Sequence, residues 1–214
     1  MIQSTGNVGR AALCVAAMGL VVLASNVLVQ FPVQAQIGRI NLADLLTYGA
    51  FTYPAAFFVT DFTNRWLGPK VARQVVLAGF ALAVALSVWL SVPRIAIASG
   101  TAFLVAQLLD VTIFNRLRRL KWWIAPLTSS LIGSALDTVI FFSLAFAASF
   151  AALGPNDPFA IEAAPFLGAF ALDVPRWVSW AAGDFTVKMM AAGVMLLPFG
   201  VIVHAIPDIK AKAF

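Results

Sequence analysis

Two carboxylates lie inside long apolar stretches of this chain, where an ionised side chain is costly. Asp110 follows Gln107-Leu-Leu and Asp137 follows Ser134-Ala-Leu, and each is followed by Ile-Phe three and four positions later. Placing a carboxylate in hydrocarbon costs roughly 2.5–3.5 kcal/mol on insertion scales. Residues of this kind face a bundle interior or a water-filled cavity, where they meet substrates, ions or protons. The repeated pattern therefore predicts two helices that contribute to one polar site.

A second pair of ionisable residues lies further along the chain. Asp184 and Lys188 are four positions apart, so they can pair on one face of a helix. Two interpretations stay open: the pair neutralises itself so that the helix can enter the membrane, or one member faces a cavity and binds substrate or a proton. Asp137 has no cation at helical spacing, which favours a substrate or proton role for this carboxylate.

The composition places these residues in a membrane. The chain is 62% hydrophobic and 11% charged, with a mean hydropathy of +0.94. Continuous apolar runs of 18 or more residues indicate transmembrane helices rather than the alternating strands of a barrel. The net charge of +5 is carried by short loops, which indicates membrane orientation rather than nucleic-acid binding.

Known catalytic signatures are absent from the sequence. A phosphate loop of the G-x-x-x-x-G-K-[ST] type, an H-E-x-x-H motif and a nucleophile elbow are all missing. The single Cys14 excludes an internal disulfide and a cysteine cluster for metal. We therefore expect a protein that is not an enzyme, does not hydrolyse ATP itself and uses no cofactor or metal.

The apolar runs predict an all-α polytopic membrane protein with a single transmembrane domain over residues 1–214. We expect six transmembrane helices, at about 11–31, 43–62, 71–91, 95–115, 125–148 and 176–203, and an external loop at 149–175. Cations concentrate in the segments on one side, which favours cytoplasmic N- and C-termini. All six tryptophans fall near predicted span ends, where an aromatic belt belongs.

Depth along each span indicates which side chains share a level. At about 1.5 Å per residue, Asp137 reaches the middle of a hydrocarbon core about 30 Å thick. Polar and aromatic side chains from other spans lie near this level, and they could contact one ligand. The candidate substrate contacts are Asp137, Asp184, Lys188, Gln107, Asn26, Tyr53, Thr52 and Phe141.

A second set lies closer to the predicted cytoplasmic face. Asp110, Asp61 and Asn64 are candidates for a gate or for proton coupling. Asp110 could instead pair with Arg116 or Arg118 at the membrane edge. Asp61 could be a capped and paired span end beside Asn64 and Arg65.

Several motifs occur in a fixed order along the chain. They are Pro54…Thr60-Asp61…Asn64…Gly68…Ala72-Arg73, then Gln107-Leu-Leu-Asp110-Val…Phe114, then Trp122-Trp123…Asp137-Thr138…Phe141-Phe142. This set resembles the queuosine precursor transporter family, also called the vitamin uptake transporter family. The resemblance covers roughly residues 20–200, nearly the whole chain.

The resemblance implies a multi-pass protein of the bacterial inner membrane that imports 7-cyano-7-deazaguanine or 7-aminomethyl-7-deazaguanine for queuosine synthesis in tRNA. One edge of this base presents an N–H and an NH2 side by side, which a carboxylate can accept together. We expect Asp137 to be the main ligand carboxylate, with Asp184–Lys188 as second contact or proton-coupling element. The implied partners are the deazapurine and the lipid bilayer, without nucleic acid; a homodimer is left open.

Two other functions are consistent with the sequence. The chain could be a substrate-binding membrane subunit that needs a separate ATPase, as vitamin-uptake modules do. It could also be a membrane scaffold without a substrate, which would leave the acids near the midplane unexplained. Transport by the purified chain alone in liposomes separates the first from a self-sufficient importer, and a ligand-induced thermal shift argues against the second.

Overall fold

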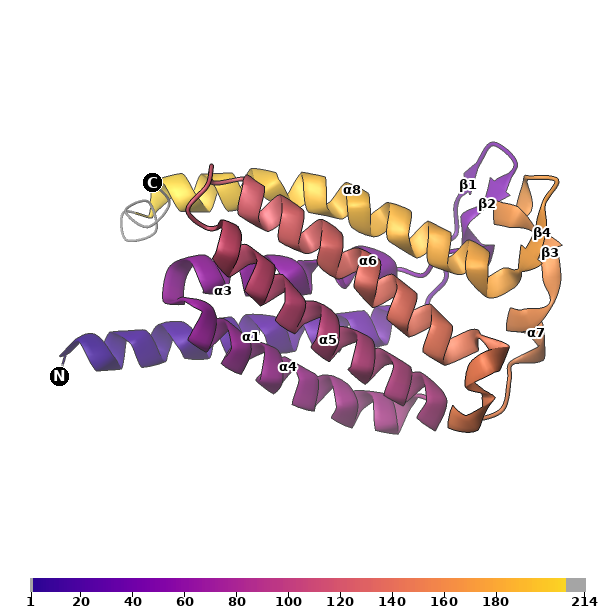
Figure 1. Cartoon of the computed structure of the whole chain (residues 1–214), viewed down its shortest axis with the longest axis horizontal. Helices are drawn as coiled ribbons and strands as arrows, with labels where there is room; N and C mark the ends of the chain where they lie inside the picture. The colour runs from indigo at the N-terminus through magenta and orange to yellow at the C-terminus, as the bar shows by residue number, and fades with distance from the viewer. Residues whose placement is uncertain (1, 207–214) are drawn as a thin grey trace.

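Long helices run side by side through most of the molecule (Figure 1). The computed structural model describes residues 2–206, with side chains from residue 7 onward. Among these residues, five helices are long and apolar enough to cross a membrane. They are α1 (Ile2–Leu28), α4 (Pro69–Leu90), α5 (Pro93–Leu117), α6 (Ile124–Phe146) and α8 (Arg176–Ala205). The start of α1 and the end of α8 lie at one end of the bundle, here called the terminal end (Figure 1).

The opposite end, here called the hairpin end, carries the irregular segments (Figure 1). Between α1 and α2 these are β1 (Gln36–Ile37), β2 (Ile40–Asn41) and the 3-10 turn η1 (Leu42–Asp44). Between α6 and α8 they are η2 (Ala148–Leu153), α7 (Pro158–Ile161), β3 (Ala163–Pro165), η3 (Phe166–Gly168) and β4 (Asp173–Pro175). Both strand pairs are antiparallel two-stranded hairpins.

The structure differs from the expected second span at 43–62. The helix begins only at Gly49, as α2 (Gly49–Thr52), and continues after an interruption as α3 (Ala55–Leu67). Pro54 causes the interruption, because it has no N–H to donate and its ring disfavours a regular helix. Tyr53 and Pro54 keep right-handed helical angles, so the helix tightens here rather than unfolding.

The interrupted helix α2–α3 lies at the centre of the bundle. α3 packs against each of the five long helices, α1, α4, α5, α6 and α8. The long helices pack in the order α1, α4, α5, α6 and α8 around it. The most polar helix is thus shielded from the surroundings by the five most apolar ones.

Two short connections fix the neighbouring helices. Gly68 alone joins α3 to α4, and its φ of +89° is a conformation that favours glycine. Pro69 follows as the first residue of α4, where a missing N–H costs nothing. Ser91 and Val92 are extended, and Pro93 starts α5 in the same way.

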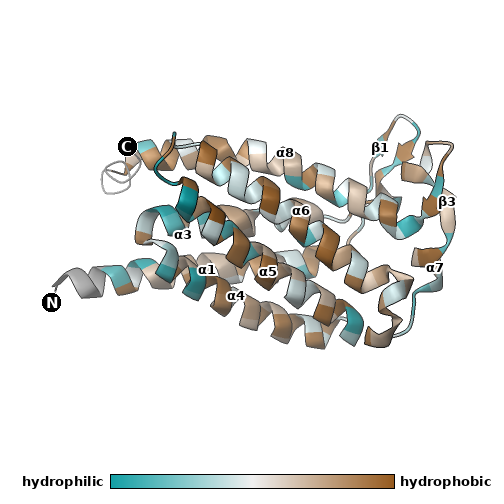
Figure 2. Ribbon diagram, in the orientation of Figure 1, coloured by the Kyte–Doolittle hydropathy of each residue, from teal (hydrophilic) through white to brown (hydrophobic). Residues whose placement is uncertain are grey.

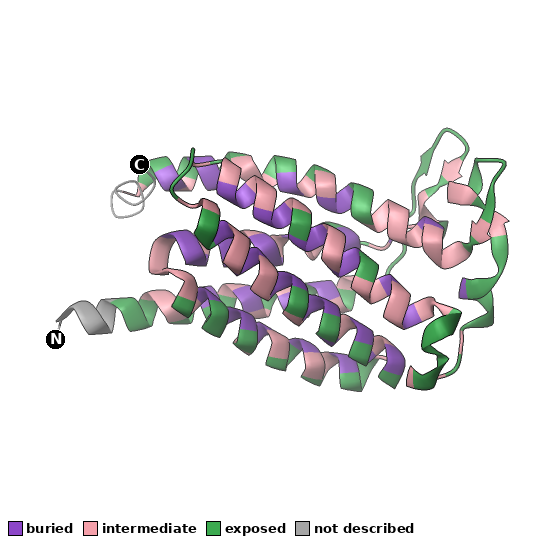
Figure 3. Cartoon of the chain, viewed as in Figure 1, coloured by how far each residue is buried: buried purple, intermediate pink, exposed green. Residues whose placement is uncertain are grey.

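Polarity is inverted relative to a water-soluble protein (Figures 2 and 3). Large apolar side chains are exposed along the long helices: Trp89 is 82% exposed and Leu197 is 73% exposed. Charged side chains are buried instead, among them Asp110 at 0% and Lys188 at 3%. An apolar outside suits lipid, and charges kept inside must find partners within the protein.

Arg94 fastens the hairpin end to the helices. The sequence shows it as the cation of a tight turn, but in the structure it is only 4% exposed. Its Nε donates to the carbonyl of Leu144 at 2.9 Å, and its guanidinium donates to the Ala147 carbonyl at 2.7 Å and to Asn156 Oδ1 at 2.9 Å. These bonds satisfy carbonyls at the end of α6 and hold the following loop against α5.

Candidate functional site

A cavity of about 670 Å³ enters the bundle from the hairpin end. Its rim includes residues 43–47, Phe159 and Arg176, and its deepest polar residues are Asp137 and Lys188. Pockets that bind small molecules have volumes of roughly 300–1,000 Å³. The interrupted helix supplies part of the wall through Tyr53, beside Pro54. Transporter sites are typically formed next to such discontinuous helices.

Lys188 of α8 organises the floor of this cavity. Its Nζ donates to Asp137 Oδ2 at 2.7 Å and to Asp184 Oδ2 at 2.5 Å. It also lies 3.3 Å from Thr138 Oγ1 and 5.4 Å from the centre of the Tyr53 ring. The group formed by Asp137, Lys188 and Asp184 is here called the lysine cluster. With both carboxylates ionised, it carries a net charge of −1.

The two carboxylates of the lysine cluster are not equivalent. Both oxygens of Asp137 are occupied, because Lys188 donates to Oδ2 and the Tyr53 hydroxyl donates to Oδ1 at 3.3 Å. On Asp184, Lys188 and Thr138 both donate to Oδ2, which leaves Oδ1 without a donor among the described residues. The Asp184 side chain is 15% exposed, against 4% for Asp137. Asp184 is therefore the carboxylate with a free oxygen facing the cavity.

Aromatic side chains form much of the cavity wall. They are Tyr53, Phe141, Phe142, Phe146, Phe159 and Trp180. Phe146 lies edge-on to Trp180, with 5.4 Å between the ring centroids. Trp180 is counted with the interfacial belt in the sequence, yet it lines the cavity, because its position near the start of α8 lies at the mouth. Such a wall suits a flat, apolar ring.

Six of the eight candidate substrate contacts line the cavity: Asp137, Asp184, Lys188, Asn26, Tyr53 and Phe141. Two do not. Thr52 lies within hydrogen-bond distance of Ser25 at 3.1 Å, and Gln107 accepts a hydrogen bond from Thr60 at 2.6 Å. Gln107 of α5 faces α3 rather than the cavity, because depth along a helix does not fix the direction around its axis.

The three candidate gate or coupling residues lie within the helix interface towards the terminal end. Asp61 accepts hydrogen bonds from Ser129 Oγ and Ser130 Oγ of α6, both at 3.0 Å. Asn64 donates to the Val111 carbonyl of α5 at 3.0 Å. Asp61 is not a capped span end beside Asn64 and Arg65, because α3 continues to Leu67 and keeps it inside the bundle.

The position of Asp110 contradicts one of its two interpretations, the ion pair with Arg116 or Arg118 at the membrane edge. Neither Arg116 nor Arg118 is within ion-pair distance of it among the described residues, and its side chain is fully buried. Asp110 lies next to Asp61, and no group of the described residues donates a hydrogen bond to its carboxyl oxygens. The two carboxyls are here called the Asp61–Asp110 pair.

The terminal end of the bundle is closed. Arg65 of α3 donates to the Arg118 carbonyl at 2.6 Å and to the Trp122 carbonyl at 3.5 Å, so it holds the loop between α5 and α6. Its guanidinium lies 5.1 Å from the centre of the Phe114 ring. Phe58 and Phe114 each pack edge-on against Phe199. Together these side chains separate the lysine cluster from the terminal end.

A central cavity, open at one end and closed at the other within a helical bundle covered by apolar side chains, defines a membrane transporter for a small molecule. Comparisons with known proteins identify its family. A family model described as "Putative vitamin uptake transporter" matches residues 47–92 and 86–203. The chain belongs to this family, as its ordered motifs predict. No solved structure gave a significant match.

Three bacterial proteins are similar to the chain. The "Probable queuosine precursor transporter" of Haemophilus influenzae is 33% identical over 87% of this chain and 83% of its own length. The "Queuosine precursor transporter" of Escherichia coli K12 is 33% identical over 86% of this chain and 82% of its own length. A "Probable queuosine precursor transporter" of Bacillus subtilis is 28% identical over 47% of this chain and 56% of its own length. The expectation of a multi-pass inner-membrane transporter rather than an enzyme is confirmed by this membership.

Proposed function

We propose that this protein imports a queuosine precursor, 7-cyano-7-deazaguanine or 7-aminomethyl-7-deazaguanine, across the bacterial inner membrane. Two similar proteins, which align with this chain over more than four fifths of their own length, are named as queuosine precursor transporters. The observation that carries the proposal is the lysine cluster at the floor of an aromatic cavity. A flat base with a polar edge matches a cavity that combines one free carboxylate oxygen with aromatic walls.

Asp184 is the proposed main acceptor of the base. Its free Oδ1 accepts from the N–H and NH2 of the base edge, and hydrogen bonds to a charged group are the stronger kind. Lys188 donates to the carbonyl of the base, and Tyr53 and Phe141 contact the ring faces. Asp137 then fixes Lys188 and Tyr53 in place, so the roles first expected for the two carboxylates are exchanged.

The proposed topology has six crossings, with α2–α3 as the second. Gly49–Leu67 at about 1.5 Å per residue spans about 28 Å, close to the thickness of the hydrocarbon core. The distribution of cations supports cytoplasmic termini. In this orientation the cavity opens to the outside, and Arg65, Phe114 and Phe199 close the cytoplasmic side. Import requires that this closure open while the hairpin end closes.

Release of the base then depends on the closed terminal end. A shift of α3 against α5 and α8 breaks the Arg65 hydrogen bond to the loop after α5 and separates Phe58 from Phe199 at the same time. Energy supply by a separate ATPase is not favoured, because the similar proteins are named as transporters rather than as subunits.

The proposal is tested with purified protein and with cells that cannot make 7-cyano-7-deazaguanine. The base should raise the melting temperature of the wild type, whereas guanine and unrelated vitamins should raise it less. Asp184→Asn should weaken binding about 10- to 100-fold, because it removes a charge-assisted hydrogen bond worth about 1.5–3 kcal/mol. The matched control is Asp173→Asn, an exposed carboxylate of β4 outside the cavity. Unchanged uptake by Asp184→Asn would contradict the proposed contact, and absence of any thermal shift in the wild type would contradict the substrate.

A further inference from the structure

The Asp61–Asp110 pair is not used by the proposed substrate site. Asp61 is 2% exposed and Asp110 is 0% exposed, and neither lines the large cavity. Both oxygens of Asp61 accept from the hydroxyls of Ser129 and Ser130. The oxygens of Asp110 accept from no donor in the part of the chain that the structure describes. A fully buried carboxyl with no donor costs free energy unless something not yet counted satisfies it.

The surroundings of this pair supply no ion pair from the part of the chain that the structure describes. Within residues 7–206, neither carboxylate lies within ion-pair distance of a lysine or arginine. Arg65, one turn further along α3, interacts electrostatically with Asp61, and it donates hydrogen bonds to loop carbonyls. Lys188 of α8 is held by the lysine cluster. Two adjacent carboxylates in a dry site cannot both stay ionised, whereas one shared proton makes each an adequate partner for the other.

A small cavity lies between Asp61 and the lysine cluster. It has a volume of about 20 Å³, and its lining includes Asp61, Ser130 and Lys188. Lys188 lines the large cavity as well, so it lies between the two. This volume holds about one water, which needs polar partners of this kind. A proton can therefore reach Asp61 from the large cavity through one water beside Lys188.

We infer that the Asp61–Asp110 pair binds the proton that drives uptake, one for each imported base. This inference rests on the proposed function. In the loaded pair, one carboxyl carries the proton and donates it to the other carboxylate. Release breaks that O–H bond, passes the proton to water at the terminal end and leaves two adjacent carboxylates. Their repulsion separates α3 from α5, the two helices whose Arg65 and Phe114 close the terminal end.

The inference is tested with purified protein in liposomes and radiolabelled 7-cyano-7-deazaguanine. With an acidic exterior, the wild type should accumulate the base about tenfold for each pH unit across the membrane, since one proton moves per base. Asp110→Asn and Asp61→Asn should only equilibrate the base, a loss of about tenfold at one pH unit. Both variants should still bind the base and exchange it across the membrane, because an amide N–H replaces the shared proton. Asp173→Asn should accumulate the base like the wild type.

The outcomes separate the inference from the proposed function. Accumulation by both variants at the wild-type level overturns the proton site. A wild type that exchanges the base but ignores the pH gradient, or that responds to a sodium gradient instead, also overturns it while the substrate assignment stands. A wild type that neither binds nor exchanges the base overturns the substrate assignment itself. Binding by each variant within about threefold of the wild type shows that it is folded.

Discussion

Two groups of buried acids lie within the same bundle, yet they are satisfied in different ways. In the lysine cluster a cation pairs with both carboxylates, and one oxygen of Asp184 faces a cavity of about 670 Å³. In the Asp61–Asp110 pair no lysine or arginine of the described residues lies within ion-pair distance, and the hydrogen bonds come from Ser129 and Ser130. The first arrangement can exchange a protein partner for a polar ligand. The second borders a cavity of only about 20 Å³, which has room for about one water but not for the base.

The two groups share the elements that would have to move. Tyr53, just before the interruption at Pro54, contacts the lysine cluster, and Asp61 lies two turns further along α3. On α6, Asp137 and Ser130 are likewise two turns apart. A displacement of α3 against α6 changes the partners of both groups at the same time. Coupling between base and proton therefore needs no long pathway, since one interrupted helix touches both sites.

The largest effect is expected for Lys188→Met, which removes the one cation of the lysine cluster and keeps the side-chain volume. Asp137 and Asp184 would then face each other without a positive charge. Removing one partner from a buried ion pair costs about 3–5 kcal/mol. We expect a large fall in melting temperature and at least a 100-fold loss of uptake, measured in detergent and in cells.

Two variants sharpen this result. Lys121→Met is the control, because Lys121 is exposed in the loop between α5 and α6. Lys188→Met combined with Asp137→Asn should regain most of the melting temperature but not uptake, since the charge of the cluster returns from −2 to −1 and the donor to the base is not restored. Wild-type uptake by the single Lys188→Met variant would show that the lysine cluster only neutralises its own charges so that the helices can enter the membrane.

Local spacing was enough to predict part of the site. Asp184 and Lys188 lie four residues apart on one helix, and the structure pairs them at 2.5 Å. The contact of Lys188 with Asp137 was not predictable in this way, because the two residues lie on different helices whose rotation is set by packing. Gln107 illustrates the same limit: its position along the helix did not reveal that it faces Thr60 instead of the cavity.

The interrupted helix shows a second limit. Residues 43–62 are apolar overall but contain several polar side chains, and one uninterrupted span was the simplest interpretation. Pro54 could have indicated the interruption, since proline disfavours a regular helix interior. The start at Gly49 and the extension to Leu67 depend on contacts with all five long helices, which no local pattern contains. That extension moved Asp61 from a span end into the interior.

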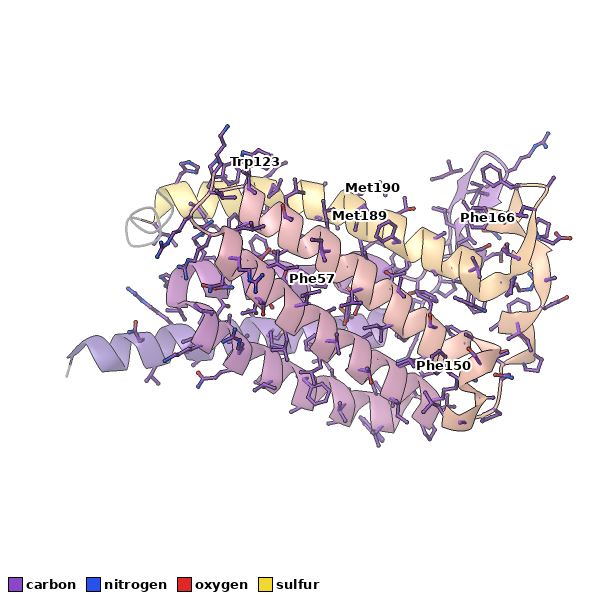
Figure 4. All side chains as sticks on the ribbon, in the orientation of Figure 1. Phe57, Trp123, Phe150, Phe166, Met189 and Met190 are labelled. Atoms are coloured by element: carbon purple, nitrogen blue, oxygen red, sulfur yellow. The ribbon has the colours of Figure 1, made fainter. Side chains whose placement is uncertain are left out.

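An intermediate effect is expected for Gly133→Ala, at the boundary between the two groups of acids. Gly133 lies on α6 between Ser130 and Asp137, and an added Cβ would lie 2.7 Å from Cε1 of Phe57. Phe57 is 2% exposed and lies in the interior of the bundle (Figure 4), so the ring has little room to move. Overpacking of this kind costs about 1–3 kcal/mol. Thermal unfolding of the purified variant measures it.

Gly193→Ala is the matched control for this substitution. Gly193 is also inside a long helix, but nothing lies within 4 Å of an added Cβ. Alanine favours a helix over glycine by up to about 1 kcal/mol, so this variant should be unchanged or more stable. Equal destabilisation of the two variants would mean that the close contact between Phe57 and α6 is not the reason why Gly133→Ala is costly.

The smallest effect is expected for Arg176→Gln at the mouth of the cavity, although its ion pair resembles the buried one in geometry. Arg176 lies 3.1 Å from Glu162, but the two side chains are 33% and 56% exposed. Water screens such a pair, which typically contributes less than about 1 kcal/mol. Melting temperature should therefore change little, and uptake should change less than about twofold. If Arg176→Gln instead reduced uptake as strongly as Lys188→Met, with binding unchanged, the charge at the mouth would control entry of the base. The effects of Arg176 and Lys188 on uptake would then depend on where each residue lies along the path of the base, and not on how deeply its charge is buried.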